Sequence, residues 1–128
     1  NEFFSALISR NKTLELFLDK RLEIVSPEFI LKEFEKHNEE ISEKSNLSAE
    51  EISSFLFLIK SKIKFFRTEE FKEFLKDAQK ISPDSNDVEY FALALKLNCP
   101  IWSEDKKLRK QDRIELLSTS ELIKQLGL

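Results

Sequence analysis

Residues 83–106 read PDSNDVEYFALALKLNCPIWSEDK and contain the clearest order of elements in the chain: an acidic loop, a helix and a strand. The loop surrounds Pro83, and the Ala- and Leu-rich segment after it predicts a helix over residues 87–97. Residues 99–103, CPIWS, are typical of a short buried strand, and the acids Glu104 and Asp105 follow it directly. In open α/β sheets ligands bind beyond the carboxyl ends of the strands, so these acids are the first candidates for a site.

The rest of the chain continues this alternation of helices and short strands. Further strands are predicted at residues 22–25, 64–67 and 114–117. Helices are predicted at residues 3–8, 11–20, 27–42 (with Pro27 in the first turn), 52–63 (after a capping box at Ser48 and Glu51), 69–80, 106–110 and from Ser118 or Ser120 to Gly127. This order predicts an α/β fold with an open parallel sheet covered by helices, in a single domain spanning residues 1–128.

The scarce residue types exclude several kinds of site. A single Gly excludes the Gly-rich loops that cradle phosphates, because those loops need glycines where the backbone approaches the ligand. One Cys (Cys99) and one His (His37) exclude an internal disulfide and a Cys/His zinc cage. We interpret Cys99 as a small buried hydrophobe. If this chain performs chemistry, we therefore expect it to use carboxylates, hydroxyls and an oxygen-binding metal.

The lengths of the apolar stretches and the net charge indicate where the protein is located and what it can bind. No apolar stretch approaches the roughly 20 residues of a membrane span, and no secretory signal is visible, so we expect a cytoplasmic protein with no membrane partner. The net charge of −3 argues against broad non-specific nucleic-acid binding but leaves room for a local basic patch.

Three acidic groups could hold Mg²⁺ or Mn²⁺, which prefer carboxylate oxygens. Asp105 follows the strand at residues 99–103, and Asp84 and Asp87 lie three residues apart at the start of the helix at residues 87–97. The alternative for each is a structural role at a helix start. Asp105 would cap the helix at residues 106–110. Asp84 and Asp87 would interact favourably with the dipole of the helix at residues 87–97, and Asn86 and Glu89 could form its capping box. The third candidate, Glu33, lies in an acid-rich helix where a solvated charge is the ordinary alternative.

A basic run follows Asp105 and comprises Lys106, Lys107, Arg109, Lys110 and Arg113. A polymer carrying phosphates would meet these charges on its way to a metal at Asp105. The alternative is an ordinary exposed turn.

Residues 83–106 resemble the C-terminal half of PIN-domain ribonucleases, which often read Asp-x-x-Asp, an Ala/Leu-rich helix, and a strand ending in Ser/Thr-x-Asp. Residues 1–8 are similar to the Asn and short helix of the family's first motif, and Glu33-Phe34 matches the second acidic motif less strictly. The resemblance covers nearly the whole chain.

The resemblance implies a central parallel sheet flanked by helices and a Mg²⁺- or Mn²⁺-dependent endoribonuclease that hydrolyses RNA. It makes Glu33, Asp87 and Asp105 catalytic metal ligands, with Asp84 as an auxiliary acid. Asn1 and Ser103 match polar residues beside the first and final motifs, and Lys106 and Lys107 would contact RNA. Some members are toxins neutralised by a small antitoxin protein, so this role is also open here.

The sequence departs from the family at its start, because the first strand and its metal-binding Asp would lie before Asn1. We therefore expect either a fragment or a version weak in metal binding and activity. The alternative function is a catalytically inactive PIN-like module that binds RNA or protein, and a small phosphatase is a third possibility. Exposed Phe and Leu on the helices that begin near Ile52 and Glu69 could form a homodimer face.

Overall fold

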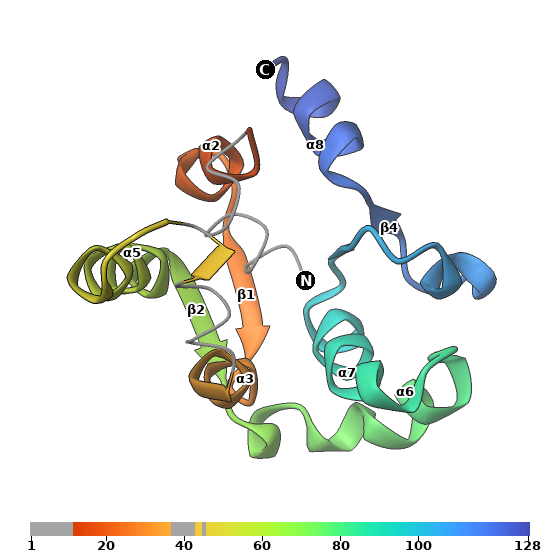
Figure 1. Ribbon diagram of the computed structural model, residues 1–128. Helices are drawn as coiled ribbons and strands as arrows, with labels where there is room; N and C mark the ends of the chain where they lie inside the picture. The colour runs from red at the N-terminus through yellow and green to blue at the C-terminus, as the bar shows by residue number, and fades with distance from the viewer. Residues whose placement is uncertain (1–11, 37–42, 45) are drawn as a thin grey trace. The chain divides into compact units, whose positions relative to one another are not determined.

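The structure is a computed structural model in which residues 12–36, 43–44 and 46–128 are described (Figure 1). Contacts along the chain divide it into two compact units. The first comprises residues 1–25 and 29–65, and the second comprises residues 26–28 and 66–128. The expectation of one domain over residues 1–128 stays a prediction.

The first unit pairs two strands and packs helices around them. Its described elements are α2 (Lys12–Leu18), β1 (Ile24–Pro27), α3 (Ile30–Lys36), α5 (Ala49–Lys62) and β2 (Ile63–Phe66), of which both strands end in residues of the second unit. The strands β1 and β2 form a two-stranded sheet, and their arrows point the same way in Figure 1. Helix α2 packs on α5. Among the residues of this unit that the structure describes, the buried apolar side chains are Leu16, Phe17, Ile30, Leu47, Ile52 and Ile63.

Helix α5 begins at the capping box that the sequence predicts. The backbone N–H of Glu51 donates to Ser48 Oγ at 3.1 Å, and the Ser48 N–H donates to Glu51 Oε1 at 3.1 Å. At the other end of the helix, Lys62 Nζ donates to the carbonyl oxygen of Asp19 at 2.8 Å. These contacts satisfy N–H groups that the first turn leaves without helical partners, and they tie α5 to the loop after α2.

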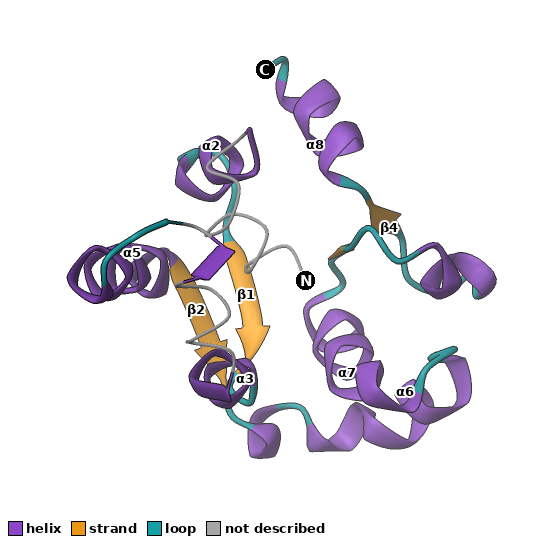
Figure 2. Cartoon of the chain, viewed as in Figure 1, coloured by secondary structure: helices purple, strands orange, loops and turns teal. Residues whose placement is uncertain are grey.

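The second unit is built mainly from helices (Figure 2). Its elements are the 3₁₀ turns η1 (Thr68–Glu70) and η2 (Lys72–Phe74), helix α6 (Leu75–Ile81), the 3₁₀ turn η3 (Ser85–Asp87), helix α7 (Val88–Leu97), strand β3 (Ile101–Trp102), the 3₁₀ helix η4 (Lys106–Lys110), strand β4 (Leu116–Leu117) and helix α8 (Thr119–Leu126). Helix α7 packs against α6 and β3. Phe71, Ala78 and Phe91 are completely buried, so the core of this unit lies around α6 and α7.

Strands β3 and β4 are parallel, with Ile101 opposite Leu116 and Trp102 opposite Leu117. Ile101 N–H donates to the Glu115 carbonyl at 2.9 Å, and Ser103 N–H donates to the Leu117 carbonyl at 3.0 Å. The expectation of an α/β fold with parallel strands and several helices is confirmed, and the described strands form two pairs. The carboxyl ends of β3 and β4 lie side by side, so Ser103 and Ser118, the residues that follow these strands, lie at the same edge of the sheet.

The last helix follows its sequence signals closely. Ser118 is the N-cap of α8 and forms a capping box with Glu121, with Glu121 N–H donating to Ser118 Oγ at 3.1 Å and Ser118 N–H donating to Glu121 Oε1 at 2.9 Å. Gly127 ends the helix in the left-handed conformation at φ 71°, where a residue without Cβ is unstrained. Of the two predicted starting points, Ser118 is therefore correct.

Two predicted helices begin differently in the structure, and the strand predicted at residues 22–25 is found at Ile24–Pro27. Pro27 is the last residue of β1 rather than the first turn of a helix, because Glu28 N–H continues the pairing with the Phe66 carbonyl at 2.8 Å and α3 begins only at Ile30. The helix predicted at residues 69–80 begins as η1 and η2, because Phe71 takes φ −132° between them. The helix predicted at residues 3–8, and residues 37–42 of the helix after Pro27, lie outside the described residues. None of the described helices is long and apolar enough to cross a membrane.

Candidate active site

Asp105 begins a 3₁₀ helix at the carboxyl edge of β3. Its Oδ1 accepts a hydrogen bond from the Lys107 N–H at 3.0 Å, which makes Asp105 the N-cap of η4. Its own N–H donates to Ser103 Oγ at 3.0 Å. The capping alternative is therefore confirmed for Asp105, and it engages one of the two carboxylate oxygens.

Asp84 and Asp87 lie together at the start of α7. Asp84 Oδ1 accepts from the Asn86 N–H at 2.8 Å, and the Asp84 carbonyl accepts from the Asp87 N–H at 3.1 Å. Asp87 is the half-buried N-cap residue of α7. The capping box predicted for Asn86 and Glu89 is wrong: Asp84 caps the turn, and Glu89 Oε1 accepts instead from the Thr68 hydroxyl at 2.9 Å.

Glu33 belongs to the first unit, on α3, with its side chain 39% exposed. Its Oε1 lies 3.7 Å from Lys36 Nζ. Asn1 lies outside the described residues, as does His37. The predicted acids have the oxygen donors that suit Mg²⁺ or Mn²⁺, but no three His, Cys, Asp or Glu side chains within the described ranges come together as a metal-binding group. The donor types therefore fit a divalent ion, while the assembly of the ligand set stays a prediction.

A pocket of about 410 Å³ opens at the carboxyl edge of β3 and β4 and is lined by Ser103, Glu104, Lys106, Arg109 and Ser118. Ser103 and Lys106 were candidates from the sequence, whereas Lys107 is exposed and is not among the lining residues. Ser118 was missed. It follows β4 as Ser103 follows β3, so the positional rule that selected Ser103 would also have found Ser118.

Helix α8 is attached to this pocket through its first turn. Trp102 Nε1 donates to Thr119 Oγ1 at 3.0 Å, and the Thr119 N–H donates to Glu104 Oε1 at 2.6 Å. The Arg109 guanidinium pairs with Glu121 Oε1. This guanidinium, together with the N–H and hydroxyl of Ser118, lowers the pKa of Glu121 from its usual 4.5 to about 2. The loop after β3 is therefore fixed to α8 by hydrogen bonds and one ion pair.

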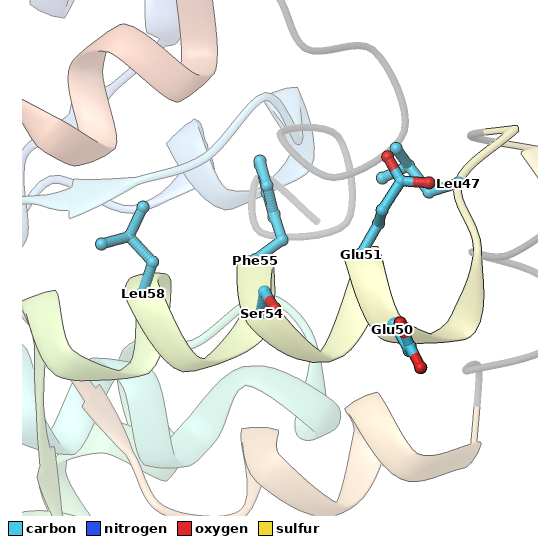
Figure 3. Close-up of a pocket in the computed structure, with 6 residues that line it drawn as sticks. All are labelled: Leu47, Glu50, Glu51, Ser54, Phe55 and Leu58. Carbon is cyan, nitrogen blue, oxygen red and sulfur yellow. The ribbon is translucent and has the colours of Figure 1, made fainter.

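A larger hollow, of about 540 Å³, lies along α5 in the first unit and is lined by Leu47, Glu50, Glu51, Ser54, Phe55 and Leu58. Figure 3 shows Leu58, Phe55 and Glu51 rising from the same side of the helix. The Glu51 carboxylate already accepts the Ser48 N–H of the capping box. This hollow is open and largely apolar, and it contains none of the acids predicted to bind a metal.

Cys99 is half-buried, and this burial raises the pKa of its thiol. Because the thiolate is the nucleophilic form, the raised pKa disfavours a catalytic role. Cys99 is thus half-buried rather than fully buried as interpreted, and its raised pKa is consistent with a residue that is not a nucleophile.

A family model described as PIN domain matches residues 1–121 of the chain. No curated protein and no solved structure gives a significant match.

Proposed function

Because the chain belongs to the PIN-domain family, whose members are typically metal-dependent nucleases, we propose that it is an endoribonuclease that hydrolyses RNA phosphodiester bonds with Mg²⁺ or Mn²⁺. The position of Asp105 carries the proposal. This acid follows β3 at the edge where two parallel strands end, which is where α/β sheets place their ligands.

In this proposal the carboxylates of Glu33, Asp87 and Asp105 hold the metal ion, with Asp84 as an additional acid. A bound divalent ion offsets negative charge on the phosphate oxygens and lowers the pKa of a bound water, which supplies a nucleophile at neutral pH. Asp105 remains a suitable ligand while it caps η4, because the cap uses Oδ1 and leaves Oδ2 available among the described contacts.

The chain's other predicted residues bind and orient the RNA. Lys106 lines the pocket at the strand edge, and the exposed Lys107 lies next to it in sequence. Their ammonium groups attract phosphates, and the Ser103 hydroxyl has donor and acceptor capacity beside them. Asn1 is proposed as a further polar contact on the basis of the family's first motif.

The test is cleavage of a labelled single-stranded RNA in Mn²⁺, in Mg²⁺ and in a chelator. We expect cleavage only with metal, and loss of cleavage in Asp87→Asn and Glu33→Gln. The matched control is Asp77→Asn, an exposed Asp on α6 that is outside the proposed site. Metal-independent cleavage, or full activity in Asp87→Asn, would contradict the proposed ligand set.

The alternative is a PIN-like module that binds RNA or protein without cutting. The observation that favours it is that Asp84 and Asp105 both use a carboxylate oxygen to cap a backbone turn. Tight RNA binding by a folded protein that cleaves with neither metal would support this alternative. Hydrolysis of nitrophenyl phosphate without RNA cleavage would instead indicate a phosphatase.

We also propose a cytoplasmic location and two protein partners, namely a small antitoxin and a second copy of the chain. Helix α5 exposes Phe57 (77%) and Leu58 (49%), whereas Phe71 is buried and Phe74 and Leu75 are half-buried. Of the two helices expected to form a dimer face, only α5 is therefore suited to the role. Light scattering of the wild type and Phe57→Ser tests the dimer, and growth arrest relieved by a co-expressed small protein tests the toxin role.

A further inference from the structure

The pocket at the ends of β3 and β4 is lined by an arginine, Arg109, that has no role in the proposed metal site. Its lining combines two basic side chains, Lys106 and Arg109, with two hydroxyls, Ser103 and Ser118. The acid in the lining, Glu104, has Oε1 engaged by the Thr119 N–H at 2.6 Å. Basic groups with hydroxyl donors are the chemistry that binds a phosphate, and a guanidinium can hold two of its oxygens at once.

The ion pair that Arg109 forms is exposed to solvent. Arg109 lies on η4 and pairs with Glu121 on α8, and both side chains are about half exposed, at 43% and 45%. Ion pairs exposed to this degree contribute little to stability, because water screens the charges. Arg109 can therefore exchange the Glu121 carboxylate for a phosphate at small cost.

Glu121 also belongs to the capping box of α8, which holds its side chain near the pocket. Its Oε1 accepts the Ser118 N–H at 2.9 Å, and its own N–H donates to Ser118 Oγ at 3.1 Å. The capping box holds the carboxylate at the start of α8, on the same residue, Ser118, that lines the pocket. Its negative charge is thus fixed beside the place where an anion would bind.

We infer that this pocket binds an internal phosphate of single-stranded RNA through Arg109 and Lys106, and that Glu121 limits its affinity by competing for Arg109. The inference rests on the proposed function for the identity of the polymer. It goes beyond that function by placing Arg109 of the basic run at one defined phosphate pocket, and by assigning a negative control of binding to Glu121, a residue outside the predicted site.

The capping box makes a selective test available, because Gln replaces Glu at this position without losing the acceptor for the Ser118 N–H. Glu121→Gln removes the charge and keeps the cap, so it releases Arg109 while α8 still begins at Ser118. The matched control is Glu115→Gln, an exposed acid ahead of β4 that removes the same charge from the chain. Arg109→Gln is paired with Arg113→Gln, an exposed Arg of the same basic run that does not line the pocket.

The measurement is the affinity for a labelled oligouridylate in a chelating buffer, over a range of salt concentrations. We expect Glu121→Gln to bind about twofold to fivefold more tightly than Glu115→Gln, the range of a solvent-exposed ion pair. Arg109→Gln should bind more weakly than Arg113→Gln and reduce the slope of log affinity against log salt by about 0.7, the value for one phosphate of a single strand. In the double variant Arg109→Gln/Glu121→Gln the gain from Glu121→Gln should disappear.

Equal affinities for Glu121→Gln and Glu115→Gln, or a gain that persists without Arg109, would overturn the inference. Competition by uridine monophosphate as effective as that by the oligouridylate would do so too, since the site would then take a terminal phosphate. Binding without metal is measured separately from cleavage, so the two proposals fail separately. A chain that binds as predicted and never cuts contradicts the nuclease, while a nuclease indifferent to Glu121→Gln contradicts the pocket.

Discussion

The carboxylate of Asp105 accepts a hydrogen bond from the Lys107 N–H at 3.0 Å, so the acid expected to bind a metal also begins the 3₁₀ helix η4. The two roles use different properties of the side chain. A cap needs one oxygen acceptor, whereas a divalent ion needs the negative charge. Substitutions that separate these properties therefore separate structure from chemistry.

Asp105→Asn should abolish metal-dependent cleavage and leave the fold intact. Asn caps helices as well as Asp does, so we expect a change in the free energy of unfolding below about 0.5 kcal/mol, against a loss of about 1 kcal/mol for Asp105→Ala. Urea unfolding and RNA cleavage measured on the same preparations check both parts. Asp112→Asn, at an exposed position of the neighbouring loop, should be wild type in both assays.

Gln111 holds the loop between η4 and β4 through both ends of its side-chain amide. Nε2 donates to the carbonyls of Leu108 and Ile114 at 2.9 Å each, and Oε1 accepts from the N–H groups of Arg113 at 2.9 Å and Ile114 at 2.8 Å. Gln111→Glu keeps the acceptor but places an oxygen against two carbonyl oxygens, so it should reduce the free energy of unfolding by about 1–3 kcal/mol. Urea unfolding measures this loss.

The control for Gln111 is Gln125→Glu, the same change at an exposed position of α8. We expect it to alter the free energy of unfolding by no more than about 0.5 kcal/mol. Equal effects at the two positions would show that the four hydrogen bonds of Gln111 contribute nothing to stability.

Local signals predicted much of this fold. The Ala/Leu-rich run of α7, the short apolar strand β3 and the capping box of α5 each depend on neighbours in sequence, and all three are present in the structure. Residues 68–74 differ because the spacing of Phe71 and Phe74 fits a 3₁₀ turn as well as an α-helix. Complete burial of Phe71 is decided by packing, which a pattern along the chain does not contain.

The candidate site was predictable to a smaller extent. Asp84 and Asp105 could be singled out by position, together with their capping alternatives, because both roles are local. The pairing of Arg109 with Glu121 spans twelve residues and joins two elements, so no spacing rule indicates it. The same holds for Gln111, whose loop has no periodicity.

Burial distinguishes two phenylalanines, Phe57 and Phe71, that look alike in the sequence. Phe71 is 0% exposed and Phe57 is 77% exposed. Phe71→Ala should therefore reduce the free energy of unfolding by about 3–5 kcal/mol, from lost burial and the cavity left behind. At a protein concentration where the chain is a monomer, Phe57→Ala should change it by less than about 0.5 kcal/mol. Urea unfolding at low protein concentration compares the two variants, and a loss for Phe57→Ala that appears only at high concentration would support the proposed dimer face on α5.

The carboxyl groups of Asp19 and Glu121 should make the free energy of unfolding decrease as the pH falls from about 4.5 towards 2. Arg21 holds the pKa of Asp19 at about 2, below its usual 3.8, through hydrogen bonds at 2.8–3.0 Å. Glu121 beside Arg109 is likewise lowered from 4.5 to about 2. A carboxyl whose pKa is depressed in the folded protein binds fewer protons there than in the unfolded chain. The stability it contributes, which is small for the solvent-exposed Glu121, is therefore complete above pH 4.5 and is lost as the pH falls towards 2.

Glu121→Gln removes one of these two groups and keeps the cap of α8, so its urea midpoint should fall less steeply than that of the wild type below pH 4.5. Arg109→Gln should flatten the profile in the same way, because the Glu121 pKa then returns towards its usual value. Both effects should shrink in high salt, since the pair is exposed to solvent. A wild-type profile in both variants would show that the Arg109–Glu121 pair is not formed in solution, and the competition inferred for the RNA pocket would then lose its physical basis.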